Sequence, residues 1–175
     1  MFFRGKAPEG SVWRRFRSGL DGFTFVKEKD HFAAHVVANA ERVVDLFHAL
    51  LEHLPPAVSV AVEDVRSGAK WEGREIALPD VRDAVARMKV PLRTYGGVEF
   101  TVFSPEDQLA LNPHIELFVY ARTDQWLYII QGKGLQEQRS LRTRSWKLRR
   151  SEFPPAPELS DAVSGAADRL GLAST

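Results

Sequence analysis

Apolar residues recur at helical spacing in the segment of residues 40–54, AERVVDLFHALLEHL. Val43, Phe47, Leu50 and Leu54 fall on one face of a helix with 3.6 residues per turn. The opposite face carries polar side chains: Glu41, Asp45, His48 and Glu52. This pattern predicts an amphipathic helix with one buried and one solvated face.

Two further segments have helical patterns with start and stop signals. Residues 79–90 begin with Pro79, which fits the first turn of a helix, and Pro91 is expected to end it. Residues 158–170 follow the sequence PPAP and stop at a glycine. The chain therefore contains two or three helices by this reading.

Elsewhere the apolar residues alternate with polar ones or form short blocks, as in β-strands. Strands are predicted over residues 22–27, 32–37, 57–65, 70–77, 97–103, 114–122, 125–131 and 138–148. Helices interrupt the early strands, but the later strands follow one another directly. That order indicates an α+β fold, a mainly antiparallel sheet of about six to eight strands with two or three helices packed on it. We expect residues 1–175 to form a single domain, with a basic and aromatic arm over residues 1–17 and a closing helix over residues 158–170.

The segments HIELFVYAR and QWLYIIQ are predicted to form a hairpin through Thr123 and Asp124. One face of this hairpin carries Leu117, Val119, Ala121, Trp126, Tyr128 and Ile130, and the other carries Phe118, Tyr120, Leu127 and Ile129. Both faces are apolar, whereas a strand with a wet side normally alternates apolar and polar residues. Helices can cover one face, and the other needs the rest of the chain, a ligand or a second subunit.

We therefore expect a homodimer that buries an apolar face of the 114–131 hairpin or an adjacent strand edge. The alternative is a monomer in which aromatic residues of the N-terminal arm fold back over that face. Those residues are Phe2, Phe3, Trp13 and Phe16.

Composition narrows the class of protein without naming it. Hydrophobic residues make up 44% and charged residues 27% of the 175 residues, as in an ordinary folded domain. The chain has no cysteine, which excludes disulfides, thiol catalysis and zinc sites that use cysteine. The N-terminus lacks the apolar core of a secretory signal, and no segment is long and apolar enough to cross a membrane. We expect a cytoplasmic protein with no membrane partner.

Basic side chains are concentrated in two segments, residues 1–17 and 139–150. The second reads RSLRTRSWKLRR, and together the two hold 11 of the 24 basic residues but one of the 23 acidic ones. The candidate partner-binding residues are Arg139, Arg142, Arg144, Trp146, Lys147, Arg149 and Arg150, with Trp13, Arg14, Arg15 and Arg17 of the arm. A charged edge strand without a ligand is the favoured interpretation. An acidic protein partner is the next, and nucleic acid is unlikely because no base-reading motif accompanies the charge.

Histidine and carboxylate residues give one metal-like cluster. Asp30, His31 and His35 lie close in sequence, and two histidines four apart share a face in either a helix or a strand. No third protein ligand follows from the spacing, so we expect no tight zinc site.

Other chemistry-bearing residues form no recognisable active site. The adjacent pair Glu63 and Asp64 should point to opposite faces of a strand. The GKG sequence at 132–134 lacks the residues of a phosphate-binding loop, and Ser164 lacks the glycine that precedes the nucleophile in a hydrolase elbow. We predict no catalytic, cofactor-binding or metal-binding residue and no cofactor.

The function is unknown from the sequence, and three interpretations follow. The leading one is a non-catalytic domain that binds a macromolecule or itself. The first alternative is an enzyme or small-molecule binder with a pocket between the sheet and helix 40–54, lined by Phe118, Tyr120 or Trp126. The second is a weak nucleic-acid binder that uses residues 1–17 and 139–150.

Overall fold

A computed structural model of the chain describes residues 21–141 and 153–175. Its strands are β1 (Gly22–Lys27), β2 (Phe32–Val37), β3 (Ala57–Asp64), β4 (Ala69–Ala77), β5 (Val98–Phe103), β6 (Asp107–Leu111), β7 (Leu117–Ala121) and β8 (Ala173–Ser174). Its helices are α1 (Ala40–Leu50), the short 3₁₀ helix η2 (Leu51–His53), α2 (Leu78–Tyr95), α3 (Gln125–Gly132) and α4 (Pro157–Arg169).

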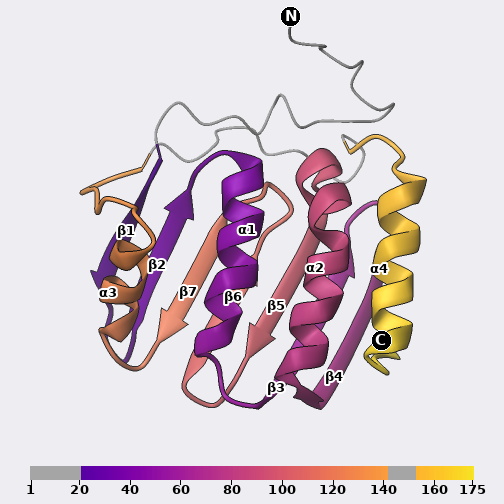
Figure 1. Cartoon of the computed structure of the whole chain (residues 1–175), viewed down its shortest axis with the longest axis horizontal. Helices are drawn as coiled ribbons and strands as arrows, with labels where there is room; N and C mark the ends of the chain where they lie inside the picture. The colour runs from indigo at the N-terminus through magenta and orange to yellow at the C-terminus, as the bar shows by residue number, and fades with distance from the viewer. Residues whose placement is uncertain (1–20, 142–152) are drawn as a thin grey trace, which may run out of the picture.

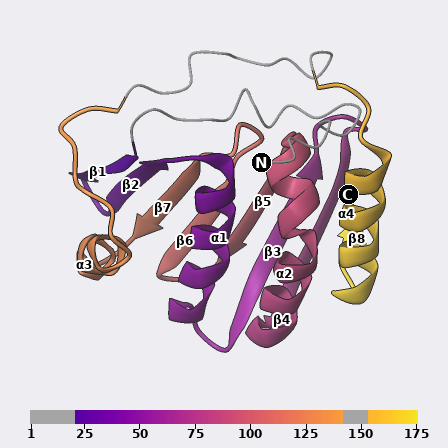
Figure 2. The same cartoon turned by 45° about the horizontal axis from the view of Figure 1, so that its top comes forward.

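The strands form one antiparallel sheet in the order β1-β2-β7-β6-β5-β3-β4-β8. The α-helices α1, α2 and α4 lie side by side against one face, and α3 lies over the end of the sheet near β1 and β2 (Figure 1). A view turned by 45° shows the same two layers (Figure 2). The predicted α+β fold is confirmed, with four α-helices rather than two or three in the described residues. We call the covered side of the sheet the helix face and the other side the open face.

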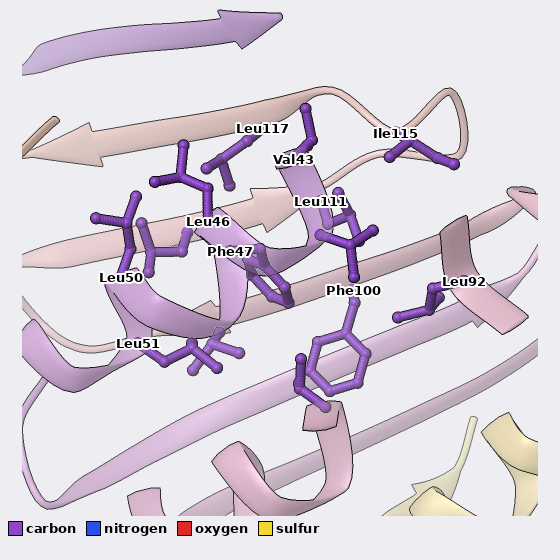
Figure 3. Close-up of a cluster of buried hydrophobic side chains, with 14 of the residues drawn as sticks. Val43, Leu46, Phe47, Leu50, Leu51, Leu92, Phe100, Leu111, Ile115 and Leu117 are labelled. Atoms are coloured by element: carbon purple, nitrogen blue, oxygen red, sulfur yellow. The ribbon is translucent and has the colours of Figure 1, made fainter. Parts of the chain in front are cut away.

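The core lies between α1, α2, α4 and the helix face. Phe47 of α1 meets Phe100 of β5 edge to face, with ring centroids 5.8 Å apart, and both side chains are fully buried. Leu50 and Leu111 pack in the same cluster (Figure 3). Burying each such side chain stabilises the fold by about 1.5–3 kcal/mol. The amphipathic pattern of residues 40–54 thus predicted both the helix and the face that it buries.

The helix α2 continues past the proline that was expected to end it. Pro91 lies inside the helix, which runs on to Tyr95 and stops at Gly96 with a φ of 58°. A proline removes one backbone hydrogen bond from a helix. Leu92 and Tyr95 are buried beyond it, and the last turn is therefore held by packing against the core.

The predicted hairpin of residues 114–131 is wrong in its second half. Residues Gln125–Gly132 form α3, and β7 pairs instead with β2 and β6. Trp126 and Ile130 are four residues apart on this helix and both are fully buried, whereas Tyr128 is 64% exposed. The short apolar run fits a helix as well as a strand, and the helix brings its two largest buried residues to one side.

Other expected boundaries also changed. The strand predicted over 114–122 is β7, Leu117–Ala121, and β6 was not predicted. Of the strand predicted over 138–148, residues 138–141 are not in a strand and the rest lie outside the described residues. A single parallel bridge joins Phe23 to Glu137 just before that segment. The arm of residues 1–17 also lies outside the described residues.

Candidate binding face

The open face carries two rows of side chains that cross the sheet. Strand register aligns Thr24, His35, Phe118, Ala110, Thr101, Ala61 and Glu72 in one row, which we call the His35 row. It aligns Val26, Ala33, Tyr120, Gln108, Phe103 and Ser59 in the next row, which we call the Tyr120 row. Alternate residues of a strand point to opposite faces, so the neighbours of these side chains form the core. All described helices lie on the other face of the sheet (Figure 2).

Large apolar side chains of the Tyr120 row are accessible to solvent. Val26 is 53%, Tyr120 38% and Phe103 37% exposed. Apart from His35, the two rows contain no ionisable side chain other than Tyr120 until Glu72 on β4. A solvated sheet face normally carries alternating polar residues. This face instead resembles the centre of a protein interface, where charges are rare and aromatic residues are common.

A buried polar pair fixes the middle of the His35 row. The Nε2 atom of His35 lies 3.1 Å from Oε2 of Glu116, whose side chain is buried. The His35 ring stacks on Phe118 with a centroid distance of 4.5 Å and an angle of 2° between the planes. The pair holds the imidazole flat against the phenyl ring, and the two rings form one platform.

The turn that places Glu116 has a strained backbone. Ile115 has a φ of 57°, which is unusual for a β-branched residue. The side-chain oxygen of Asn112 accepts a hydrogen bond from the backbone N–H of Glu116 at 2.9 Å and stabilises the turn. Ile115 itself is buried in the core (Figure 3). Such conformations typically cost about 1–3 kcal/mol and persist where surrounding structure holds them.

The metal-like cluster does not converge. His31 and His35 share the open face as their spacing predicted, beside Tyr120 and Phe118 respectively. Each histidine has a carboxylate of its own, however, and Nε2 of His31 lies 3.0 Å from Glu28. Within residues 21–141 and 153–175, no three histidine, aspartate or glutamate side chains gather as metal ligands would.

A groove of about 710 Å³ lies at the β4 end of the open face. Its walls include Ser59, Phe103, Glu72, Arg74 and Glu75. Two residues of β4, Arg74 and Glu75, stand opposite Ser59 of β3, which defines a β-bulge. Glu75 has a φ of 54°, so the bulge holds it in the left-handed region. The sequence does not predict this groove, because the bulge depends on the register between β3 and β4.

The pocket predicted between the sheet and helix 40–54 is not assembled by the residues named for it. Phe118 belongs to the His35 row and Tyr120 to the Tyr120 row, both on the face opposite to α1. Trp126 lies on α3, where its indole N–H donates a hydrogen bond to Asp107 at 3.1 Å. Under α1, Phe47 and Phe100 fill the space against the sheet (Figure 3).

Asp107 and His48 have shifted pKa values, and neither belongs to the two rows of the open face. Burial raises the pKa of the Asp107 carboxyl, the hydrogen bond from Trp126 opposes that shift, and the negative charge of Glu106 adds to it. Burial lowers the pKa of His48, and the nearby Lys89 and Arg82 lower it further. Asp64 points to the helix face and is buried, whereas Glu63 lies on the open face, as adjacent strand residues should.

Most of the predicted partner-binding residues lie outside the described part of the chain. Arg139 is exposed and follows the bridge between Phe23 and Glu137. The other candidates, Arg142, Arg144, Trp146, Lys147, Arg149 and Arg150 together with Trp13, Arg14, Arg15 and Arg17, lie outside the described residues. The described residues include 14 basic and 21 acidic side chains, a formal charge of −7.

Comparison with known proteins assigns no class. No protein-family model, curated protein or solved structure matches the chain. None of the helices in the described ranges has the length and apolar character needed to cross a membrane.

Proposed function

We propose that this protein is a non-catalytic binding domain that recognises a macromolecule, or a copy of itself, through the open face of its sheet. The observation that carries the proposal is the run of accessible, almost uncharged side chains over β1, β2, β7, β6, β5 and β3. We also propose that the protein acts in the cytoplasm, because a chain without cysteine needs no oxidising compartment to form disulfides.

The physical argument is one of surface free energy. Contiguous exposed apolar surface on a folded domain usually marks a site that binds something. Tyr120 and Phe103 are the kind of residue that contributes most to binding, because each brings a large rigid area at low entropic cost. The His35–Phe118 platform beside Tyr120 is already ordered by Glu116, so little further ordering is required when a partner docks.

The test compares a variant on the open face with a matched variant elsewhere. Tyr120→Glu puts a charge in the middle of the open face, and Tyr128→Glu puts the same charge on α3, where the side chain is 64% exposed. Each tagged protein is incubated with native cell extract, and the macromolecules it retains are quantified. We expect the wild type and Tyr128→Glu to retain the same macromolecule, or a differently tagged copy of the chain, and Tyr120→Glu to lose it.

Circular dichroism and thermal melting establish that both variants are folded. If Tyr120→Glu is unfolded, Thr101→Arg replaces it, since Thr101 occupies the same face in the neighbouring row. Retention that is identical for all folded variants, or absent for the wild type, contradicts the proposed function.

A further inference from the structure

We propose that the open face packs against the open face of a second copy, about a twofold axis that runs across the strands between the His35 row and the Tyr120 row. This inference rests on the proposed function and names the partner. Of the two apolar hairpin faces expected from sequence, only the one with Phe118 and Tyr120 forms in the sheet, and no described helix covers it. Trp126, Tyr128 and Ile130 form no sheet face, because they belong to the helix α3.

The position of the axis fixes which residues meet. A twofold axis that lies between two stacked sheets and crosses their strands places each strand over its own copy, with the direction reversed. A residue of the His35 row then faces the residue two positions away in the Tyr120 row of the second copy. On β7, for example, Phe118 faces Tyr120 of the second copy. By symmetry, Tyr120 faces Phe118 of the second copy.

The side chains are complementary in size under this operation. His35 faces Ala33 of the second copy on β2, and Phe103 faces Thr101 on β5. Each large side chain therefore meets a smaller one, as interdigitated sheet faces require. The Phe118–Tyr120 contact is the exception, and there two aromatic rings meet, a pairing that adds about 0.5–1.5 kcal/mol in general.

The charges are complementary as well. On β4, Glu72 stands at the end of the His35 row, and the two bulge residues Arg74 and Glu75 stand at the level of the Tyr120 row. The axis brings Glu72 of each copy to the bulge of the other, where Arg74 is the residue of opposite charge. Neither side chain has an ion pair with another described residue.

Charge also rejects the other simple axis. A row above the His35 row holds Glu116, Glu99 and Glu63, because Glu63 pairs with Glu99 on β5 and Glu116 bonds to Asn112 next to it. It ends on β4 at Lys70, which neutralises Glu63 in an ion pair at 3.1 Å. A twofold axis parallel to the strands would return this row to its own level and bring Glu116 and Glu99 to the level of the same two carboxylates in the second copy. The axis across the strands moves it to the opposite end of the second copy's strands, where Arg122 follows β7 and lies 3.8 Å from Glu106.

The area is sufficient for a reversible dimer. Seven strands about 4.8 Å apart and four levels of side chains about 6.8 Å apart cover roughly 29 by 20 Å, or about 600 Å² per copy. Two copies bury about 1,200 Å², at the lower limit of specific interfaces. We therefore expect association that depends on protein concentration rather than a permanent dimer.

Sedimentation velocity of the full chain between about 1 and 200 µM tests the inference. We expect the wild type and Tyr128→Glu to convert from monomer to dimer as concentration rises, and Tyr120→Glu to remain a monomer throughout. Thr101→Arg serves as the second open-face variant if Tyr120→Glu does not fold.

A charge exchange tests the axis itself. Glu72→Arg alone and Arg74→Glu alone each create like-charge contacts twice in the dimer, and we expect dissociation constants at least about fivefold higher. The double variant with both substitutions restores opposite charges and should regain the dissociation constant of the wild type. Both exposed substitutions leave the monomer fold intact, which melting curves verify.

The possible outcomes separately test the dimer, its axis and the use of the open face. A wild type that stays monomeric at every concentration overturns the dimer but leaves the proposed function standing if Tyr120→Glu still loses a different macromolecule from extract. A dimer that Tyr120→Glu abolishes but the double exchange does not rescue overturns the axis. A dimer that survives Tyr120→Glu overturns the use of the open face.

Discussion

At the scale of single residues, Arg66 links three parts of the chain. Its Nε donates to the carbonyl of Pro154 at 2.7 Å, its Nη2 to the carbonyl of Tyr95 at 2.8 Å and its Nη1 to the carbonyl of Gly96. The last carbonyls of a helix lack partners within the helix, and here the guanidinium supplies them at the end of α2. Burial lowers the pKa of Arg66, and the nearby Asp64 opposes that shift.

We expect Arg66→Met to lower the free energy of unfolding by about 3 kcal/mol, because it leaves buried carbonyls without donors. Arg66→Lys should lose less, since one ammonium cannot reach three diverging carbonyls but can satisfy one. Urea unfolding gives both values. Arg87→Met is the control, because Arg87 makes an exposed ion pair with Asp83, and its effect should stay within about 0.5 kcal/mol. Equal effects of Arg66→Met and Arg87→Met would show that the hydrogen bonds of Arg66 contribute nothing.

The shifted pKa of Asp107 predicts how the free energy of unfolding depends on pH. Its pKa is raised in the folded protein, chiefly by burial, so the folded state holds the proton more tightly than the unfolded state does. Stability from this group is therefore present at low pH and is lost as pH rises from the ordinary value near 3.8 through the raised pKa. Asp107→Asn keeps an oxygen for the Trp126 indole but does not ionise. The free energy of unfolding of Asp107→Asn minus that of the wild type should increase with pH across this window, and a constant difference would contradict the assignment.

The two histidines show which side-chain positions could be predicted from the sequence and which could not. Spacing alone placed His31 and His35 on one face, because alternation is a local property of a strand. The Glu116 partner of His35 is 81 residues away and becomes its neighbour through the pairing of β2 with β7. That pairing was unpredictable once residues 125–131 had been assigned as the partner of β7.

At the scale of elements, the sequence predicted structure where the pattern was long and failed where it was short. The fifteen-residue periodic pattern of residues 40–54 predicted α1 correctly. In residues 125–131 almost every position is apolar, so neither a period of 2 nor one of 3.6 stands out. The strand β6, DQLAL, follows a turn-like SPE sequence and is too short to show alternation.

Helix α4 offers a paired test of two glycines. Gly165 lies in the helix interior, where an added Cβ would come no closer than 3.4 Å to the flexible end of Arg169. Gly171 has a φ of 64° and donates its N–H to Asp168, while Leu172 donates to Ala167, which closes the helix with an αL residue. We expect Gly165→Ala to raise the free energy of unfolding by about 0.5–1 kcal/mol and Gly171→Ala to lower it by about 1 kcal/mol. Chemical denaturation measures both, and two shifts of the same sign would refute the assignment of Gly171 as the cap.

At the scale of the whole molecule, charge separates along the sequence. The described residues carry a formal charge of −7 and the full chain +1, so the remaining residues carry +8. An acidic body repels phosphates at long range, while the basic segments attract them.

We therefore expect nucleic-acid binding to be weak, salt-dependent and indifferent to base sequence. Band-shift titrations with duplexes of different sequence, at about 50 and 150 mM salt, measure this. Replacing Arg142 and Arg144 by Gln should weaken any binding equally for all duplexes. Submicromolar affinity with a clear sequence preference at the higher salt concentration would contradict the prediction.

The sheet order has a consequence for the time course of synthesis. The hairpin β1–β2 is made first, but its inner edge pairs with β7, which is translated only after α1, β3, β4, α2, β5 and β6. At 5–20 residues per second the hairpin waits about 4–16 s for that neighbour. During this interval β7 of a neighbouring chain that has not yet paired with its own β2 presents the same hydrogen bonds. Crowded nascent chains on one messenger are thus exposed to exchange of their N-terminal hairpins before any of them has closed its own sheet.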